Sequence, residues 1–337
     1  MAINLLEIQP TVVSRDLRGK IVMFYGEPKT GKTTTAVRFP KSLLLAFEKG
    51  YNALNNVMAQ PINKWAEFKQ VLKQLKDPKV KEMFETVIVD TADIMWDLAE
   101  KHVCGREGVE KIGDIAFGGG YKMVEQEVDE CLRSIALMDY GLVMISHAED
   151  KEFTDESGES YQKIVPTLPK KARKIVTRMA DIIGYSRTIQ DEEGNTSVNL
   201  YMRGTPRFEA GSRWKHTPLV IEFNYQNLVN AIAEAIEIQE KEDGIIATNE
   251  HINVYKDNST YDFNEVKKEI NETIKVILTQ DEANTSKITK IVDTHLGKGR
   301  KIAEADEDQV DMLVLILFAI KRRLTRFLPF SWARRCL

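Results

Sequence analysis

The sequence predicts an α/β fold with a mainly parallel central sheet flanked by helices. Four short apolar runs, at residues 21–25, 42–47, 86–90 and 142–147, alternate with segments of helical periodicity. Apolar runs without polar alternation are typical of strands buried on both faces, as in parallel sheets. A glycine-rich loop follows the first run, and the other three end in or before a polar side chain. Ligands of such sheets bind at these carboxyl ends.

The loop after the first run reads Gly-Glu-Pro-Lys-Thr-Gly-Lys-Thr. The spacing G-x-x-x-x-G-K-[ST], between a strand and a helix, is that of the phosphate-binding P-loop. Its glycines let backbone N–H groups face the β- and γ-phosphates at the positive end of a helix. We expect Lys32 to reach the terminal phosphates and the Thr33 hydroxyl to ligate Mg²⁺. The predicted cofactors are therefore ATP and Mg²⁺, and the predicted binding segment is Gly26, Glu27, Pro28, Lys29, Thr30, Gly31, Lys32, Thr33 and Thr34.

Composition limits the class of protein. With 337 residues and 43% hydrophobic content, the chain can form one large domain and a small one. A net charge of −4 argues against strong nonspecific binding to duplex DNA. Three widely spaced cysteines favour a reducing compartment and no cysteine-based metal site. The longest apolar run, residues 312–320, is far shorter than the ~20 residues of a spanning helix. We expect a cytoplasmic protein without a membrane partner.

The remaining elements follow in order. Helical spacing predicts helices over 64–76, 93–104 and 120–138, with a glycine-rich segment at 113–120. Shorter elements complete a first domain, residues 1–240. They are strands at 161–165, 182–189, 197–202 and 219–223, helices at 170–179 and 226–240, and a hairpin turn at 191–195.

The C-terminal part differs in composition. Residues 241–262 are polar and predict a linker, and residues 263–320 predict a small domain of two or three helices. The tail, residues 321–337, contains six basic residues and no acidic one, interleaved with aromatic residues. Such a tail suits single-stranded nucleic acid or an anionic membrane surface, and a terminal extension without function is an equal alternative.

Three strand ends carry candidate catalytic side chains. Asp90 fits the acid that holds the hydration shell of Mg²⁺ opposite the P-loop hydroxyl, and its alternative is a cap of the next helix. Asp93 is a second choice for the metal, although a helix-start acid is its simpler role. Glu48 can orient the water that attacks the γ-phosphate, or it is a solvated charge. His147 can hydrogen-bond the γ-phosphate, or it is a polar strand tip.

Taken together, the loop 26–33, the strand ends at Glu48, Asp90 and His147, and the segment 118–122 resemble the phage-type AAA/RecA-like ATPases. This family is related to the RecA-like ATPases of phage single-strand annealing systems, and the resemblance covers about residues 15–240. It implies a RecA-like P-loop core that hydrolyses ATP. A glutamate after the second strand activates water in RecA-like ATPases, which implies that role for Glu48. In RecA-like ATPases a polar residue, commonly Gln, ends the strand that couples the state of the γ-phosphate to the DNA-binding loop. The resemblance implies that His147 occupies this position.

The resemblance also implies partners. They are single-stranded DNA, further copies of the chain, and a phage annealing or single-strand-binding protein. The DNA-binding loops would be 104–122, with Phe117 and Tyr121 as stacking surfaces, and 150–174. The second loop carries the basic cluster Lys163, Lys170, Lys171, Arg173 and Lys174. A neighbouring copy would contribute a basic residue to the ATP site, chosen from Arg203, Arg207, Arg213 and Lys215. Core packing and solvated surface charge are the simpler alternatives for these residues.

The sequence therefore favours a Mg²⁺-dependent ATPase that acts on single-stranded DNA in phage recombination or replication. One alternative is a nucleotide-switched accessory or loader protein with little hydrolysis of its own. Another is a small-molecule kinase, which would need an arginine-rich lid that the sequence does not display.

Overall fold

The computed structural model describes residues 10–253, 262–306 and 309–324. The chain divides into two compact units, whose described parts are residues 10–253 and residues 262–306 with 309–324. Each unit is described by itself. Residues 325–337, which are most of the predicted basic tail, lie outside the described part of the chain.

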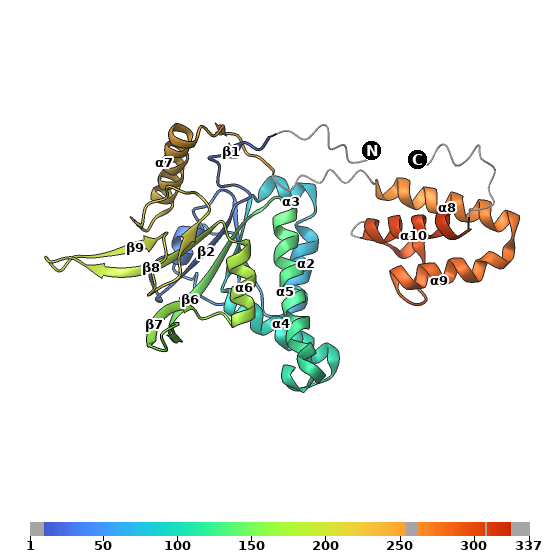
Figure 1. Cartoon of the computed structure of the whole chain (residues 1–337), viewed down its shortest axis with the longest axis horizontal. Helices are drawn as coiled ribbons and strands as arrows, with labels where there is room; N and C mark the ends of the chain where they lie inside the picture. Colours follow the sequence, from blue (N-terminus) through green and yellow to red (C-terminus); the bar gives the residue numbers. More distant parts are fainter. Residues whose placement is uncertain (1–9, 254–261, 307–308, 325–337) are drawn as a thin grey trace. The chain divides into compact units, whose positions relative to one another are not determined.

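The larger unit is built on one twisted sheet with the strand order β11-β9-β8-β2-β6-β5-β3-β4 (Figure 1). Its central strands are parallel, as predicted. They are β2 (Ile21–Gly26), β3 (Ser42–Ala46), β4 (Ala59–Pro61), β5 (Thr86–Asp90), β6 (Gly141–Thr154) and β8 (Ile182–Gln190). Antiparallel strands β9 (Thr196–Tyr201), β10 (Gly211–Ser212) and β11 (Val220–Glu222) complete one side.

Helices cover both faces of this sheet because alternate strand residues point to opposite sides. Val22 and Phe24 pack with α1 (Lys32–Ala36) and α7 (Tyr225–Asp243). Met23 and Tyr25 belong to the core of the other face. That face is covered by α2 (Trp65–Gln74), α4 (Ala92–Glu107), α5 (Gly119–Leu137) and α6 (Lys170–Met179). The predicted class, a mainly parallel sheet between helical layers, is confirmed.

Two segments differ from the expectation. Strand β6 does not end at the predicted tip, residue 147, but runs on to Thr154 and returns as β7 (Ser160–Pro166), which forms an antiparallel hairpin. Its outer half contains four consecutive charged residues, Glu149 to Glu152, so neither face resembles a buried strand. The glycine-rich segment before α5 forms two short 3₁₀ turns, Ile112–Asp114 and Ala116–Gly118. The predicted turn at 191–195 is confirmed, and the Asp191 carboxylate accepts hydrogen bonds from the backbone N–H groups of Glu193 and Asn195.

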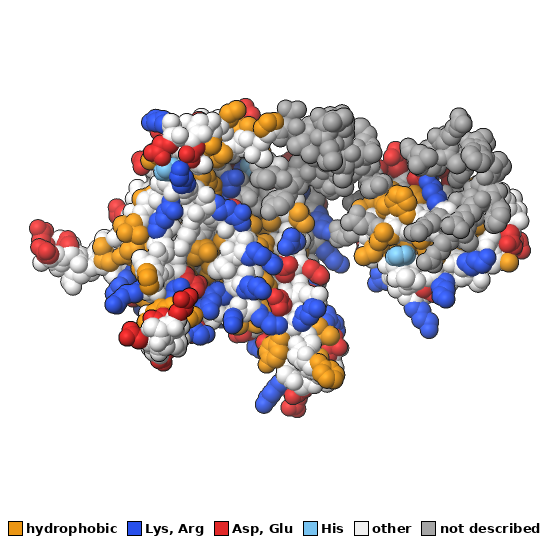
Figure 2. Space-filling model, viewed as in Figure 1, with side chains coloured by type: hydrophobic (Ala, Val, Ile, Leu, Met, Phe, Trp, Pro, Cys, Tyr) orange, Lys and Arg blue, Asp and Glu red, His pale blue; other side chains and the backbone are white. Residues whose placement is uncertain are grey.

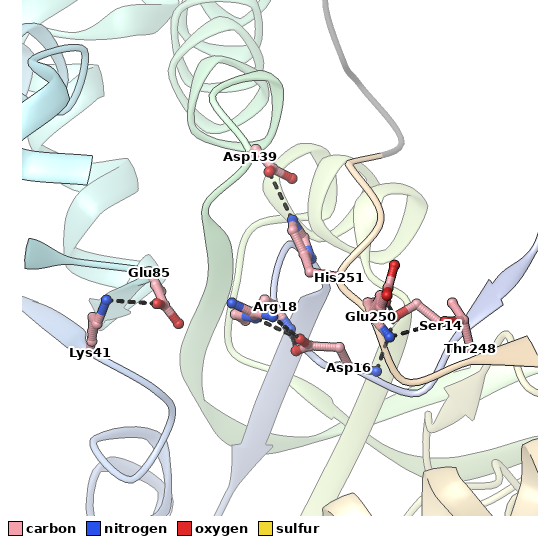
Figure 3. Close-up of polar contacts among 9 residues, drawn as sticks. All are labelled: Ser14, Asp16, Arg18, Lys41, Glu85, Asp139, Thr248, Glu250 and His251. Carbon is pink, nitrogen blue, oxygen red and sulfur yellow. Dashed lines mark hydrogen bonds and ion pairs between the residues drawn. The ribbon is translucent and has the colours of Figure 1, made fainter. Parts of the chain in front are cut away.

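Polar contacts connect the segments at the amino ends of the parallel strands, which we call the amino edge of the sheet (Figure 3). Strand β1 (Val13–Ser14) pairs in parallel with β12 (Ala247–Thr248), and the Ser14 hydroxyl donates to the Glu250 carbonyl at 2.7 Å. His251 Nε2 lies 2.8 Å from Asp139 Oδ2 at the end of α5. Part of the segment expected to be a linker, residues 241–262, therefore continues α7 to Asp243 and then folds back onto the larger unit.

The smaller unit consists of α8 (Phe263–Gln280), α9 (Thr285–Leu296) and α10 (Val310–Leu324), with 3₁₀ turns at Glu282–Asn284 and Ile302–Glu304. Its core is a separate cluster that includes the fully buried Ile270, Leu313 and Ile316. Within the described ranges, no helix is both long enough and apolar enough to cross a membrane.

Candidate nucleotide-binding site

The P-loop follows β2 and is shaped by two of its glycines. A Cβ atom on Gly26 would lie 2.1 Å from the carbonyl oxygen of Ser186 on the neighbouring strand β8, so only glycine fits there. Gly31 has φ 76°, a left-handed conformation that side chains disfavour, and it caps the start of α1. The Thr30 hydroxyl contacts the Ser186 hydroxyl at 2.7 Å and donates to the Glu27 carbonyl at 2.9 Å. Ser186 of strand β8 thus packs against the loop and holds its conformation.

Lys32 is folded back along its own loop. Its ammonium group donates to the carbonyls of Gly26 at 3.0 Å and Glu27 at 2.6 Å, and the residue is only 6% exposed. Burial lowers the pKa of Lys32, and the nearby carboxylates of Asp90 and Glu48 oppose this shift. The lysine is therefore a cation held inside the loop, where anionic phosphate oxygens are favourable neighbours.

Asp90 lies at the end of β5, directly opposite the P-loop helix. The Thr33 hydroxyl donates to Asp90 Oδ2 at 2.8 Å, so the two residues predicted to hold Mg²⁺ are in contact. Burial raises the pKa of the Asp90 carboxyl, while the hydrogen bond from Thr33 lowers it. The second oxygen, Oδ1, is buried without a hydrogen-bond partner in the described structure. A buried carboxylate oxygen with no donor beside a threonine hydroxyl fits a hydrated divalent cation.

Glu48 and His147 meet across the end of β5. Their side chains come within 3.7 Å, between Glu48 Oε2 and His147 Nε2, and both are partly exposed. The backbone N–H of Glu48 donates to the Asp90 carbonyl at 3.2 Å, which fixes the glutamate beside the acid. His147 Nδ1 is buried and lacks a hydrogen-bond partner among the described residues. All four predicted catalytic side chains, Lys32, Glu48, Asp90 and His147, therefore gather at one edge of the sheet.

A polar network that the sequence did not indicate lies behind this edge. Asp93, in the first turn of α4, accepts hydrogen bonds from the hydroxyls of Ser146 at 3.1 Å and Thr167. The Thr167 backbone N–H donates to the His147 carbonyl at 3.1 Å. Asp93 is a helix-start acid, as expected, and it also joins β6 to the segment before α6. Serine and threonine at separate strand ends give no recognisable motif.

A cavity of about 330 Å³ beside the P-loop was also not predicted. Backbone and side chains of residues 29–31 form one wall, with Arg38 after α1. Tyr225, at the start of α7, lies on the other side, and its ring packs on Phe39 with centroids 4.8 Å apart. Tyr225 is 187 positions from Arg38 and belongs to no local pattern, so only the fold brings the two together.

The basic residues predicted to act on a neighbouring copy have different surroundings. Arg203 donates to the carbonyls of Trp214 and Thr217, and Arg213 pairs with Asp181 at 3.0 Å. Lys215 pairs with Asp243 at 3.2 Å. Arg207 is exposed, and it stands next to the segment paired with β7. The first three are held by contacts within their own chain, although Arg213 and Lys215 are exposed, as Arg207 is.

The two predicted DNA-binding loops also differ in charge. The β6–β7 hairpin, residues 149–163, carries six acidic residues and two basic ones. Helix α6 carries five basic residues and no acidic one. Figure 2 shows Lys and Arg side chains gathered over α6 and acidic side chains at the hairpin. The hairpin half of the predicted loop 150–174 is therefore unfavourable for phosphate contacts, and its helical half is favourable.

Comparison with known proteins agrees with this site. A family model described as an AAA domain matches residues 18–214. The chain is 34% identical over 328 residues to the SPbeta prophage-derived uncharacterized protein YorG of Bacillus subtilis (strain 168), which covers 95% of this chain and 98% of the relative. The P-loop, the acid at the end of β5 and the parallel sheet all lie within the matched AAA domain. The chain therefore belongs to the AAA-domain family of P-loop ATPases, as a phage-type member.

Proposed function

We propose that the protein binds ATP with Mg²⁺ and hydrolyses it at the carboxyl edge of β2, β5 and β6. The contact between Thr33 and Asp90 at 2.8 Å, with the second Asp90 oxygen free of donors, carries this proposal. The Thr33 hydroxyl and the Asp90 carboxylate lie side by side next to the phosphate-binding loop, where they would hold Mg²⁺. When bound, the cation would neutralise negative charge on the phosphates.

Two kinds of group in the loop would bind the phosphates, backbone N–H groups and the Lys32 ammonium. Backbone N–H groups of residues 29–34 would face the β- and γ-phosphates, and Lys32 would exchange its two carbonyl contacts for phosphate oxygens. A charge-assisted hydrogen bond to phosphate is stronger than one to a neutral carbonyl, so the exchange favours binding.

Glu48 is the candidate for orienting the attacking water. Its carboxylate is partly exposed, stands beside Asp90, and is fixed at its backbone. A base needs hydrogen-bond reach to the water, and the backbone contact of Glu48 with Asp90 supports such a position for it next to a γ-phosphate on the P-loop. His147, in contact with Glu48, would hydrogen-bond the γ-phosphate or release it after cleavage.

The cavity beside the P-loop fits the nucleoside end of ATP. It is continuous with residues 29–31 and combines the Tyr225 ring with the exposed Arg38. An aromatic face and a cation suit a purine base, because stacking and cation–π attraction need no particular base edge. This arrangement predicts tight triphosphate recognition with little discrimination between ATP and GTP.

We further propose that single-stranded DNA binds over α6 and that nucleotide state reaches it through Thr167. Lys170 and Lys174 are exposed on this helix, whereas Lys171 and Arg178 already pair with Glu125 and Asp129. Thr167 is bonded to His147 and Asp93 and stands just before the helix. A shift of His147 on loss of the γ-phosphate would therefore be transmitted to the start of α6. A neighbouring copy, with Arg207, and a phage annealing or single-strand-binding protein would be the further partners in phage recombination or replication.

One observation favours the alternative of a nucleotide-switched accessory protein. Glu48 Oε2 lies 3.7 Å from His147 Nε2, so the imidazole would compete with water for the carboxylate, and hydrolysis would be slow until a partner separates the two side chains. The small-molecule kinase has no such observation in its favour.

The test is a steady-state ATPase assay of wild type and Glu48→Gln, with Mg²⁺ or with chelator, and with or without single-stranded DNA. The proposal predicts Mg²⁺-dependent turnover that DNA stimulates and that falls by about 10²-fold or more in Glu48→Gln. Glu85→Gln is the matched control, because Glu85 pairs with Lys41 at the opposite edge of the sheet. A rate that is equal in wild type and Glu48→Gln would reject hydrolysis at this site.

A further inference from the structure

Helix α10 of the smaller unit is apolar on every side but is buried on only one. Residues 312–320 are nine consecutive apolar residues, and a helix turns such a run through all directions. Leu313, Ile316 and Ile320 are fully buried in the core shared with α8 and α9 (Figure 1). A helix that is apolar all round is normally covered all round. The second side of α10 therefore lacks a partner among the described residues.

Three large side chains form the open side of α10. Met312, Leu315 and Phe318 are 43%, 49% and 60% exposed and follow one another at intervals of three residues. Residues three apart are neighbours on a helix surface, so the three form one apolar strip, which we call the α10 strip. Within the described residues of the smaller unit, no other large apolar side chain is exposed to this degree. The apolar exposure is therefore gathered in one place, as at a docking surface.

The segment that directly follows α10, residues 325–337, has a composition that suits the α10 strip. It lies outside the described part of the chain, and its sequence contains three arginines and no acidic residue. Its large apolar residues are Phe327, Leu328, Phe330, Trp332 and Leu337. Apolar and aromatic surface of this amount is stabilised by leaving water for a matching apolar face. The sequence of the segment thus complements the face that α10 leaves open.

The segment is long enough to return along the whole strip. Met312 is 12 residues from Leu324, the last residue of α10, which is about 18 Å at 1.5 Å per residue. The 13 residues that follow can span about 40 Å when extended, or roughly twice that distance. Pro329 cannot continue a helix, so the chain can reverse its direction there. In an extended stretch after the proline, Phe330 and Trp332 would share one face.

Charge sets the direction of such a return. Residues 302–311, which lead into α10, carry five acidic side chains and no basic one, although residues 298–301 before them carry three basic ones. The end of α10 is basic, with three cations at residues 321–323. The arginine pair at residues 334–335 is therefore favoured at the start of the helix and disfavoured at its end. The described carboxylates near that start are those of the exposed Glu304 and Asp306.

We propose that residues 325–337 fold back antiparallel along α10 and cover the α10 strip of the same chain. Phe330 and Trp332 are the anchors on the strip, and Arg334 and Arg335 lie toward the acidic stretch before the helix. Because the segment is tethered to the helix, its effective concentration is high, and a small apolar contact holds it. The strip offers no partner to the phosphates of nucleic acid, and the acidic stretch beside it opposes an anionic membrane. This inference does not depend on whether the protein binds or hydrolyses ATP.

Quenching of Trp332 fluorescence by acrylamide in the full-length protein tests the proposal. The other tryptophans are 2%, 3% and 7% exposed, and they are Trp65, Trp96 and Trp214. The quenchable signal that Trp332→Phe removes therefore belongs to Trp332. In wild type this signal should be protected relative to a synthetic peptide of residues 325–337. The double variant Leu315→Asp/Phe318→Asp should lose the protection, because charged groups then replace the centre of the strip.

Leu219→Asp is the matched control, because Leu219 is 53% exposed on the larger unit, and it should keep the protection of Trp332. Arg334→Glu/Arg335→Glu leaves the strip intact and should reduce the protection, most clearly at low salt. A Trp332 signal as accessible in wild type as in the peptide, or protection retained in Leu315→Asp/Phe318→Asp, would overturn the proposal. So would protection that rises with protein concentration, which would indicate a second copy. Protection that appears only with oligothymidine, or only with vesicles of phosphatidylcholine and phosphatidylglycerol, would likewise overturn it and assign the segment to that partner.

Discussion

The amino and carboxyl ends of the parallel strands differ in how far their polar side chains are paired. At the amino edge, Asp139 is paired with His251, Glu85 with Lys41, and Asp16 with Arg18 (Figure 3). At the carboxyl edge, Asp90 and Asp93 each keep one buried oxygen without a hydrogen-bond partner within the described residues, and His147 keeps such a nitrogen. Unpaired buried polar atoms cost stability unless a ligand satisfies them.

This difference separates a structural edge from a ligand-binding edge built on the same strands. Acidic side chains of the amino edge pair with basic ones of the same chain, and among the residues of Figure 3 one buried atom, His251 Nδ1, lacks a hydrogen-bond partner. At the carboxyl edge two carboxylates and a histidine each keep such an atom, which a charged ligand would satisfy. Substitutions at the carboxyl edge should therefore change nucleotide binding more than stability, and substitutions at the amino edge should do the reverse.

The largest effect is expected for Lys32→Ala. Removing the buried ammonium group deletes charge-assisted hydrogen bonds to phosphate, which should weaken ATP affinity by about 100-fold or more. Titration calorimetry with Mg²⁺ and ATP measures this loss. Lys41→Ala removes a lysine from the amino edge and should leave the affinity unchanged. Equal ATP affinity in wild type and Lys32→Ala would contradict the assignment of the carboxyl edge as the ligand-binding edge.

His251→Ala should show the reverse pattern. It removes the contact with Asp139 and part of the anchoring of β12, which should lower the free energy of unfolding by about 1–2 kcal/mol. Chemical denaturation measures the loss, and His102→Ala, at an exposed site on α4, is the matched control. ATP affinity should be retained. A variant that loses affinity but not stability would show that this edge is not merely structural.

Asp90→Asn should stabilise the nucleotide-free protein while it abolishes Mg²⁺-dependent turnover. Burial raises the pKa of Asp90, so its ionised form is disfavoured in the folded state at neutral pH. Removing the charge should raise the free energy of unfolding by on the order of 1 kcal/mol, or roughly 2–4 °C in Tm. The gain should shrink as pH falls through the raised pKa, because the wild-type carboxyl then binds a proton in the folded state. Thermal unfolding of both proteins between pH 4 and 7 checks the sign, and a gain that grows as pH falls would contradict it.

The smallest effect is expected at Phe117, between α4 and α5, where the ring is fully exposed and the backbone is left-handed. Phe117→Asn should raise the free energy of unfolding by about 0.5–1 kcal/mol, because Asn tolerates a φ of 57° better than Phe. Leu219→Asn supplies the comparison for removing an exposed apolar side chain, because Leu219 is 53% exposed. Denaturant titration that finds Phe117→Asn less stable than wild type would show that the ring contributes to folding.

Local patterns made much of the fold and site predictable from sequence. The P-loop spacing fixes a backbone conformation by itself, and an acid at the end of an apolar run marks the carboxyl edge because parallel strands share that edge. These two rules predict that Lys32, Asp90, Glu48 and His147 share one edge of the sheet.

Features that depend on distant pairing were not predictable. Strands β1 and β12 have two residues each, so no periodicity reveals them. Thr167 meets Asp93 only because β7 returns along β6, and Tyr225 meets Arg38 only because α7 covers the same face as α1. The outer half of β6 is charged and lacks the apolar run of a buried strand, so the sequence does not predict the β6–β7 hairpin.

The central claim, that the incomplete edge binds and cleaves ATP, is tested most directly by identifying the nucleotide that stays on the protein. Wild type and Glu48→Gln would be incubated with Mg²⁺ and ATP, separated rapidly from free nucleotide, and denatured for chromatography. We predict ADP on wild type and intact ATP, near one per chain, on Glu48→Gln. Intact ATP on both proteins would show a binding switch without hydrolysis, and no nucleotide on either would contradict the site itself.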